Sequence, residues 1–170
     1  QLSAATSKPW NVNFFCHTSP APDPEGEQRW VDALQPFYDE FAADTSAIAN
    51  GPSRQPFDED SAAVLERFRP AVVSFHYGLP DPALLARVKA TGARVLSSAT
   101  TVEEAIWLAE NGTDGVIAQG LEAGGHRGHF LSDDLSLQQG TLSLLPQIAD
   151  AISLPVIAAG GIATPAGVRA

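Results

Sequence analysis

The sequence predicts an α/β fold built on a parallel sheet. Its 170 residues alternate short apolar runs with amphipathic segments, and turn residues separate one from the other. The apolar runs are mostly β-branched or small and lack polar alternation, which is typical of strands buried on both faces. A strand that a helix returns to a parallel neighbour is the right-handed crossover unit of such sheets. The chain is long enough for one domain with a sizeable core.

Five strands are expected, at residues 12–16, 71–75, 93–96, 115–118 and 155–159. Helices are expected at 82–91, 102–111 and 140–152, and a last one at 164–170. Asp81 with Pro82 behind it begins the first of these helices, Thr101 caps the second and Gly112 ends it. Five strands cannot close an eight-stranded barrel, so both ends of the chain are expected to be truncated.

An insertion at residues 19–57 interrupts this repeat. It is rich in proline and acidic residues and carries several aromatic side chains. Residues 28–43 predict one long amphipathic helix, and residues 46–58 predict a loop. A long non-repeating insertion after a strand is often a lid or a substrate loop. A helix that merely covers the barrel or sheet explains the pattern equally well.

Charge and composition restrict the partners. The net charge of -10 and the pI near 4.6 argue against binding to nucleic acid or to anionic membrane surfaces. The apolar stretches are too short to span a bilayer and no signal peptide opens the chain, which fits a cytoplasmic protein. The single cysteine, Cys16, excludes an intramolecular disulfide. Its neighbour His17 alternates across the strand, which argues against a catalytic pair.

Two glycine-rich loops follow predicted strands and are candidate ligand sites. Residues 119–128 (QGLEAGGHRG) follow the fourth strand, and residues 158–162 (AAGGI) end the fifth. Ligands bind at the carboxyl ends of the strands in both open α/β sheets and barrels. The backbone N–H groups of paired glycines can approach a ligand closely and bind an anion. Taken alone, Gly124-Gly125 is better explained by a plain turn, and Gly160-Gly161 is explained equally by one.

Polar side chains stand at the other strand ends. His76 leaves the second strand, Ser98 ends the hydroxyl-rich third, and Gln119 follows the fourth. A single rim histidine is more often hydrogen-bonded than catalytic. His126 and His129 lack convergent carboxylates at a metal-ligand spacing, so no metal site is predicted. Because the ends of successive parallel strands converge, we expect these groups to surround a phosphorylated, planar ligand.

In chain order, the motifs VNFF, VVSFHYGLP, LSSATTVEEA, DGVIAQGLEAGGHRGHF and PVIAAGGIA resemble those of the bacterial nitronate monooxygenases, formerly called 2-nitropropane dioxygenases. The resemblance covers essentially the whole chain and is most specific at residues 119–128. It implies a (β/α)8 TIM barrel, present here as an incomplete barrel of about five βα units. It also implies bound FMN and the oxidation of alkyl nitronates, and of nitroalkanes, by dioxygen to carbonyl compounds and nitrite.

The resemblance also implies site residues. The family's catalytic histidine falls on His126, which would act as the general base toward a neutral nitroalkane. His76 at the same rim is the second choice, as a substrate contact. The flavin contacts fall on Asn13, Ser98, Gln119, Gly124, Gly125, Gly160 and Gly161. The partners expected are the nitronate or nitroalkane and dioxygen, and a homodimer is compatible with the sequence.

Two alternatives stay open. The flavin-dependent enoyl reductases of fatty-acid synthesis share the barrel and the Gly-Gly-His loop, and they use NAD(P)H with FMN. The other alternative is an inactive barrel fragment, because the family's amino-terminal glycine-rich flavin loop and carboxyl-terminal phosphate-binding strand have no counterpart in this chain. Rapid reduction of the flavin by NADH or NADPH would favour the reductase, and no flavin absorption after addition of FMN would favour the fragment.

Overall fold

The computed structural model of the chain describes residues 6–44 and 55–170. Two compact units divide the chain, one comprising Gln1–His17 with Pro56–Ala170 and the other Thr18–Gln55. The first unit holds a sheet with its helices. The described part of the second holds the helix α2 (Pro24–Glu40), on which no residue is buried.

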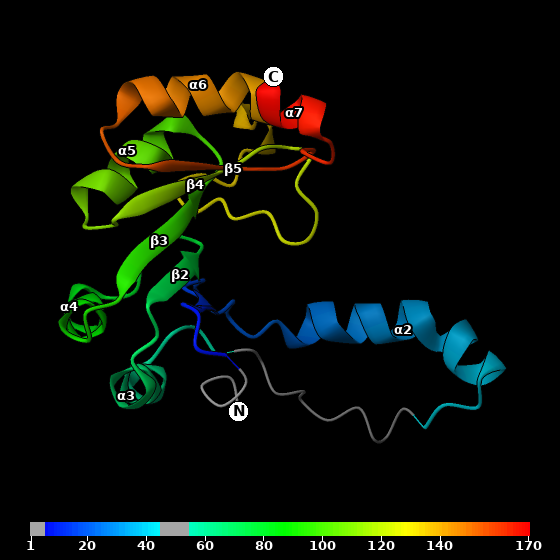
Figure 1. Cartoon of the computed structure of the whole chain (residues 1–170). Coiled ribbons are helices and arrows are strands. Elements are labelled where there is room, and N and C mark those ends of the chain that lie inside the picture. Colours follow the sequence, from blue (N-terminus) through cyan, green and yellow to red (C-terminus); the bar gives the residue numbers. More distant parts are fainter. Residues whose placement is uncertain (1–5, 45–54) are drawn as a thin grey trace. The chain divides into compact units, whose positions relative to one another are not determined.

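The first unit contains a five-stranded parallel sheet in the order β1-β2-β3-β4-β5. Its strands are β1 (Asn11–Phe15), β2 (Val72–His76), β3 (Arg94–Ala99), β4 (Gly115–Gln119) and β5 (Val156–Ala159). The helices that precede β2, β3, β4 and β5 are, in order, α3 (Glu59–Phe68), α4 (Pro82–Ala90), α5 (Val102–Glu110) and α6 (Thr141–Ala151), and α7 (Pro165–Arg169) follows β5. Figure 1 shows α3 to α6 along one face of the twisted sheet. The α/β prediction with five strands is therefore confirmed.

Alternation along the strands decides which side chains meet the helices. Val73, Phe75, Val95 and Val116 are fully buried, and the two apolar clusters to which they belong include buried helix residues. These helix residues are Leu65, Val88, Leu108, Leu144 and Ile148. Each such side chain contributes about 1.5–3 kcal/mol of transfer free energy. The core thus lies between the sheet and its helices, and the opposite face carries polar side chains such as Ser98 and Gln119 beside apolar ones such as Ile157.

The predicted helix starts are confirmed for α4 and α5. The Asp81 carboxylate accepts a hydrogen bond from Ala83 N at 2.8 Å, and Thr101 Oγ1 accepts one from Glu104 N at 3.2 Å. These contacts satisfy backbone donors that a helix leaves free in its first turn. In residues 6–44 and 55–170, no helix is long and apolar enough to cross a membrane.

Two helix predictions need correction. The helix of the insertion begins at Pro24 rather than at residue 28, because the Asp23 carboxylate accepts from Gly26 N at 2.9 Å, and it ends at Glu40 rather than at residue 43. The helix α3 was not predicted at all. Asp58 caps it by accepting from Ser61 N at 2.8 Å.

The remaining bounds shift only slightly. β3 extends to Ala99 beyond the predicted end at residue 96, while the other strand ends agree within one residue. Most of the loop predicted at 46–58 lies outside the described residues.

Candidate active site

Polar side chains of the sheet gather on the face away from the helices. Asn13 pairs with Ser74 in the register of β1 and β2, and the Ser74 hydroxyl donates to Asn13 Oδ1 at 2.9 Å. One step nearer the carboxyl end, Phe15 pairs with His76. Ser98 of β3 lies beside His76, at 2.9 Å between Oγ and Nδ1. This polar face therefore leads to the strand ends at which the sequence placed the site.

The amide of Gln119 holds the loop that follows β4. Gln119 is 7% exposed, and its Nε2 donates to the carbonyl of His126 at 2.8 Å. Its Oε1 accepts from Gly128 N at 2.8 Å. Both ends of one side-chain amide are thus bonded to the backbone on either side of Arg127. The loop is closed back onto the strand from which it came.

His76 contacts the same loop from β2. Its Nε2 lies 3.2 Å from the carbonyl oxygen of His126. Because a carbonyl can only accept, Nε2 carries the proton, and in the neutral ring Nδ1 then accepts from the Ser98 hydroxyl. Burial lowers the pKa of His76, and the nearby guanidinium of Arg127 lowers it further, although the hydrogen bond to the His126 carbonyl opposes this. The geometry and the lowered pKa agree on a neutral ring.

Gly128 lies against the His76 ring. A Cβ at this position would come within 2.6 Å of His76 Cε1, so a larger residue would displace either the ring or the loop. The close approach explains why the motif has a glycine two residues after His126. It also fixes the separation between β2 and the loop.

The imidazole of His126 is the exposed part of this assembly. Its backbone carbonyl accepts from Gln119 and His76, while its ring meets the edge of Phe15 at 5.1 Å between centroids. Among the residues that the structure describes, none hydrogen-bonds its ring nitrogens. The backbone is therefore held in place, and a ring nitrogen is left to accept a proton.

Two side chains within the loop hold its first part, residues 120–122, in place. Arg127 donates to the carbonyls of Gly120 at 2.6 Å and Leu121 at 2.9 Å. The Glu122 carboxylate accepts from the backbone N–H of Thr141 at 2.7 Å and from its hydroxyl at 2.9 Å. The hydrogen bonds from Thr141 lower the pKa of Glu122. The loop is therefore attached to the first turn of α6.

The two glycine-rich loops meet at the carboxyl ends of β4 and β5. Gly160 has a φ of +126°, and a Cβ there would come within 2.7 Å of Ala123 N. Only glycine allows the turn after β5 to pack against the loop. By contrast, a Cβ on Gly124 or Gly125 would meet nothing within 4 Å. Open space therefore lies beside the backbone of these two residues, as a planar or phosphorylated cofactor would require.

The thiol of Cys16 does not fit a catalytic role. Cys16 follows β1, and burial raises its pKa to about 12. The thiolate is the nucleophilic form of cysteine, so this thiol stays protonated and unreactive near neutral pH.

The sequence interpretation missed Glu104 as a functional residue. Glu104 is 1% exposed in the first turn of α5 and accepts from Thr100, Phe130 and Leu131. A signal for it existed, because Thr101 and Glu104 have the spacing of a capping box. The carboxylate instead bonds the residue before the cap and reaches the distant loop, which spacing alone does not predict.

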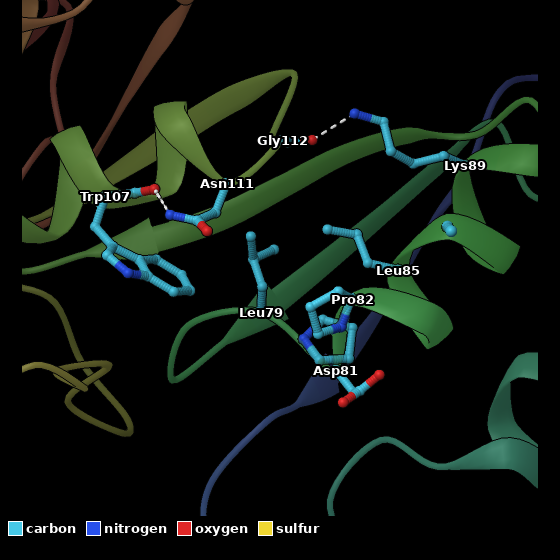
Figure 2. Close-up of a pocket in the computed structure, with 10 residues that line it drawn as sticks. Leu79, Asp81, Pro82, Leu85, Lys89, Trp107, Asn111 and Gly112 are labelled. Carbon is cyan, nitrogen blue, oxygen red and sulfur yellow. Dashed lines mark hydrogen bonds between the residues drawn. The ribbon is translucent and has the colours of Figure 1, made fainter.

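A cavity of about 520 Å³ lies elsewhere, between α4 and α5. Figure 2 shows Leu79, Leu85 and Trp107 around it. Lys89 Nζ donates to the carbonyl of Gly112 at 2.6 Å, and Asn111 Nδ2 donates to that of Trp107 at 2.8 Å. This groove, called here the α4–α5 groove, lies on the helix side of the sheet. It does not receive the residues predicted for the site.

Parallel βα units with polar groups and glycine-rich loops at their carboxyl ends define an α/β enzyme scaffold of the barrel type. The model of the nitronate monooxygenase family matches residues 1–170, and the chain belongs to this family. It is 41% identical over 171 residues to a nitronate monooxygenase of Paraburkholderia phytofirmans and 43% identical over 172 residues to one of Pseudomonas aeruginosa. Both alignments cover 100% of this chain but only 47% and 49% of the relatives. The chain thus spans about half the length of these curated relatives.

Solved structures agree with the fold. A nitroalkane oxidase from Streptomyces ansochromogenes aligns with a TM-score of 0.76 and 34% identity, covering 91% of this chain and 44% of that one. FabK from Thermotoga maritima aligns with a TM-score of 0.61 and 26% identity, covering 98% of this chain and 39% of that one. The family and these neighbours confirm the prediction of an α/β barrel of which this chain holds a part.

Proposed function

We propose that this chain provides the proton-abstracting and FMN-binding part of an enzyme that oxidises alkyl nitronates, and nitroalkanes, with dioxygen to carbonyl compounds and nitrite. One observation carries the proposal. The His126 carbonyl is held by Gln119 and His76, so the imidazole stands at the strand ends with its ring nitrogens available. Membership of the nitronate monooxygenase family supports the choice of substrate.

His126 acts as the general base toward a neutral nitroalkane. The proton on the carbon next to the nitro group passes to a ring nitrogen of His126, and the carbon's electron pair moves onto the nitro group to form the nitronate. A positioned base contributes about 10²–10⁴-fold to such a step. A nitronate that is already ionised needs no base, and for that substrate His126 serves as a hydrogen-bond or electrostatic partner. His76 is the second choice for a substrate contact from the same rim, through the surface of its ring, since both of its nitrogens are hydrogen-bonded.

The residues at the strand ends fit FMN. Gly124, Gly125, Gly160 and Gly161 offer backbone N–H groups to an anion, and Asn13, Ser98 and Gln119 offer polar side chains. Backbone donors bind a phosphate without a local excess of basic residues, which suits a chain of net charge -10. When bound, FMN supplies the transfer of one electron from the nitronate to dioxygen.

The variant His126→Asn tests the base. In the FMN-loaded protein, turnover of neutral nitroethane should fall at least about 10²-fold, whereas turnover of preformed ethylnitronate should largely survive. His129→Asn, three residues along the same loop, is the matched control and should leave both rates unchanged. Equal rates for His126→Asn and the parent protein on both substrates would overturn the assignment.

The two alternatives from the sequence have their own measurements. Rapid reduction of bound flavin by NADH or NADPH without oxygen would favour the FMN-dependent reductase. No flavin absorption after purification with added FMN would favour an inactive fragment. The homodimer and the cytoplasmic location stay predictions.

A further inference from the structure

The buried carboxylate of Glu104 connects α5 to the part of the loop that follows His126, at Phe130 and Leu131. Its Oε2 accepts from Thr100 N at 2.7 Å and from Thr100 Oγ1 at 2.9 Å. Its Oε1 accepts from Phe130 N at 2.6 Å and from Leu131 N at 3.2 Å. All four contacts come from donors, which suits a side chain whose two oxygens both act as acceptors. The first turn of a helix, where Glu104 lies, favours a negative charge.

These contacts leave little freedom to the loop after His126. Gln119 holds the backbone of residues 126 and 128, and Glu104 holds the backbone of residues 130 and 131. Only His129 separates the two sets of contacts. Phe130 also packs edge-on against Trp107 of α5, at 5.3 Å between ring centroids. A displacement at Phe130 therefore moves Gly128, and with it the backbone that presents the imidazole.

We propose that Glu104 is a positioning residue that acts through the loop to hold His126 where it can take the substrate proton. The proposal rests on the proposed role of His126 as the base. A glutamine in its place keeps the shape but turns an amide N–H toward one pair of donors. If that pair is Phe130 N and Leu131 N, the loop after His126 loses its attachment to α5. If it is the Thr100 pair, Phe130 N and Leu131 N keep an acceptor that has lost its charge, so their hydrogen bonds weaken.

The first measurement needs no cofactor. We compare amide hydrogen exchange in the parent chain, in Glu104→Gln and in the control Glu103→Gln, whose side chain is exposed on the same turn. The amides of Phe130 and Leu131 should exchange at least about 10-fold faster in Glu104→Gln, because a hydrogen bond to a charged acceptor is lost. They should be unchanged in Glu103→Gln. Unchanged exchange in Glu104→Gln would overturn the proposal.

The second measurement separates positioning from general stability. In the FMN-loaded protein, Glu104→Gln should lower kcat for nitroethane about 10-fold while the KM stays within about 2-fold and ethylnitronate turnover is kept. A merely structural role would lower both turnovers together. Equal loss on both substrates would therefore overturn the proposal even if the loop exchanges faster.

A milder variant covers the case in which Glu104→Gln does not fold. Thr100→Val keeps the side-chain shape and removes only the hydroxyl that donates to Glu104. It should raise the exchange rates of the Phe130 and Leu131 amides and lower the ratio of nitroethane to ethylnitronate turnover, both by less than Glu104→Gln does. If neither quantity changes, the proposal is overturned. His126→Asn is run beside these variants. If it too leaves the substrate ratio unchanged, the proposed function fails; if it alone shifts the ratio, only the role of Glu104 fails.

Discussion

At the strand ends, side-chain amides, imidazoles and carboxylates hold the backbone of one loop, whereas in the α4–α5 groove mainly apolar side chains surround a cavity of about 520 Å³. Gln119 and Glu104 together receive or donate six hydrogen bonds at the strand ends. In the groove, Leu79, Leu85 and Trp107 provide apolar area. Its charged side chains, Asp81 and Lys89, each hydrogen-bond a backbone group at a helix end. Gln119 lies on the face of the sheet away from the helices, whereas the groove lies on the helix side, and α5 contributes Glu104 to the first region and Trp107 to the second.

The difference shows that the size of a cavity is a poor guide to this site. A volume of about 520 Å³ falls within the range of small-molecule pockets, yet none of the residues proposed for the chemistry lines it. Convergent polar groups whose positions are fixed by several contacts are the better signal. Three predictions test whether the loop is held in the way that this comparison requires.

The largest effect is expected for Gln119→Leu. Leucine removes the acceptor for the buried Gly128 N–H and the donor to the His126 carbonyl. The free energy of unfolding should fall by about 2–4 kcal/mol, because a buried backbone donor is left without a partner. Chemical denaturation monitored by circular dichroism measures it.

The control for this variant lies in the groove. Lys89→Gln removes an exposed ammonium that donates to the Gly112 carbonyl, and it should change the free energy of unfolding by no more than about 0.5 kcal/mol. If the two variants were equally destabilised, the strand ends would be no more rigid than the groove, and the comparison would fail.

An intermediate effect is expected from a pair of glycine variants in the loop. Gly128→Ala places a methyl group within 2.6 Å of the His76 ring and should cost about 1–3 kcal/mol of stability. Gly124→Ala places its methyl group where nothing lies within 4 Å, so stability should be unchanged. If the flavin lies beside Gly124, this second variant should instead weaken FMN binding.

Thermal melting of both variants and fluorescence titration with FMN separate the two effects. A loss of stability in Gly124→Ala would mean that the space beside this residue is filled by the chain. Unchanged FMN affinity in the same variant would remove Gly124 from the cofactor contacts.

Local rules predicted most of the fold. Apolar β-branched runs located all five strands, and caps such as Asp81 and Thr101 located the helices. The helix α3 was missed because it follows the irregular insertion, where proline and acidic residues obscured the signal of Asp58. The start of α2 was missed because the prediction began the helix at residue 28 and did not use Pro24 as a first helical position.

The site was predictable in its location but not in its contacts. The motif and its place after a strand pointed to His126, and the strand ends do bring His76, Ser98 and Gln119 together with it. The hydrogen-bond partners could not be inferred. Glu104, for example, accepts from the backbone N–H of Phe130, which lies 26 residues away in the sequence. Contacts between a side chain and a distant backbone leave no periodic pattern in the sequence.

The smallest effect on the free energy of unfolding is expected when the pH is lowered and His76 takes up a proton. Burial lowers the pKa of this imidazole below its ordinary value of 6.5, whereas in the unfolded chain the ordinary value applies. Above that pH both states are neutral, and the free energy of unfolding is independent of this group. As the pH falls through 6.5, the unfolded state takes up the proton first, so stability falls until the pH passes the lower pKa of the folded state.

The variant His76→Gln isolates this contribution. It lacks the titrating ring, so its free energy of unfolding should decline less steeply than that of the parent chain between about pH 7 and about pH 5. Denaturation curves at several pH values give both slopes. Because the neutral ring donates from Nε2 to the His126 carbonyl and accepts at Nδ1 from Ser98, acid also changes the contact that holds the loop. Parallel slopes would mean that His76 titrates alike in the folded and unfolded states, and the polar strand ends would then be more open to water than their hydrogen bonds indicate.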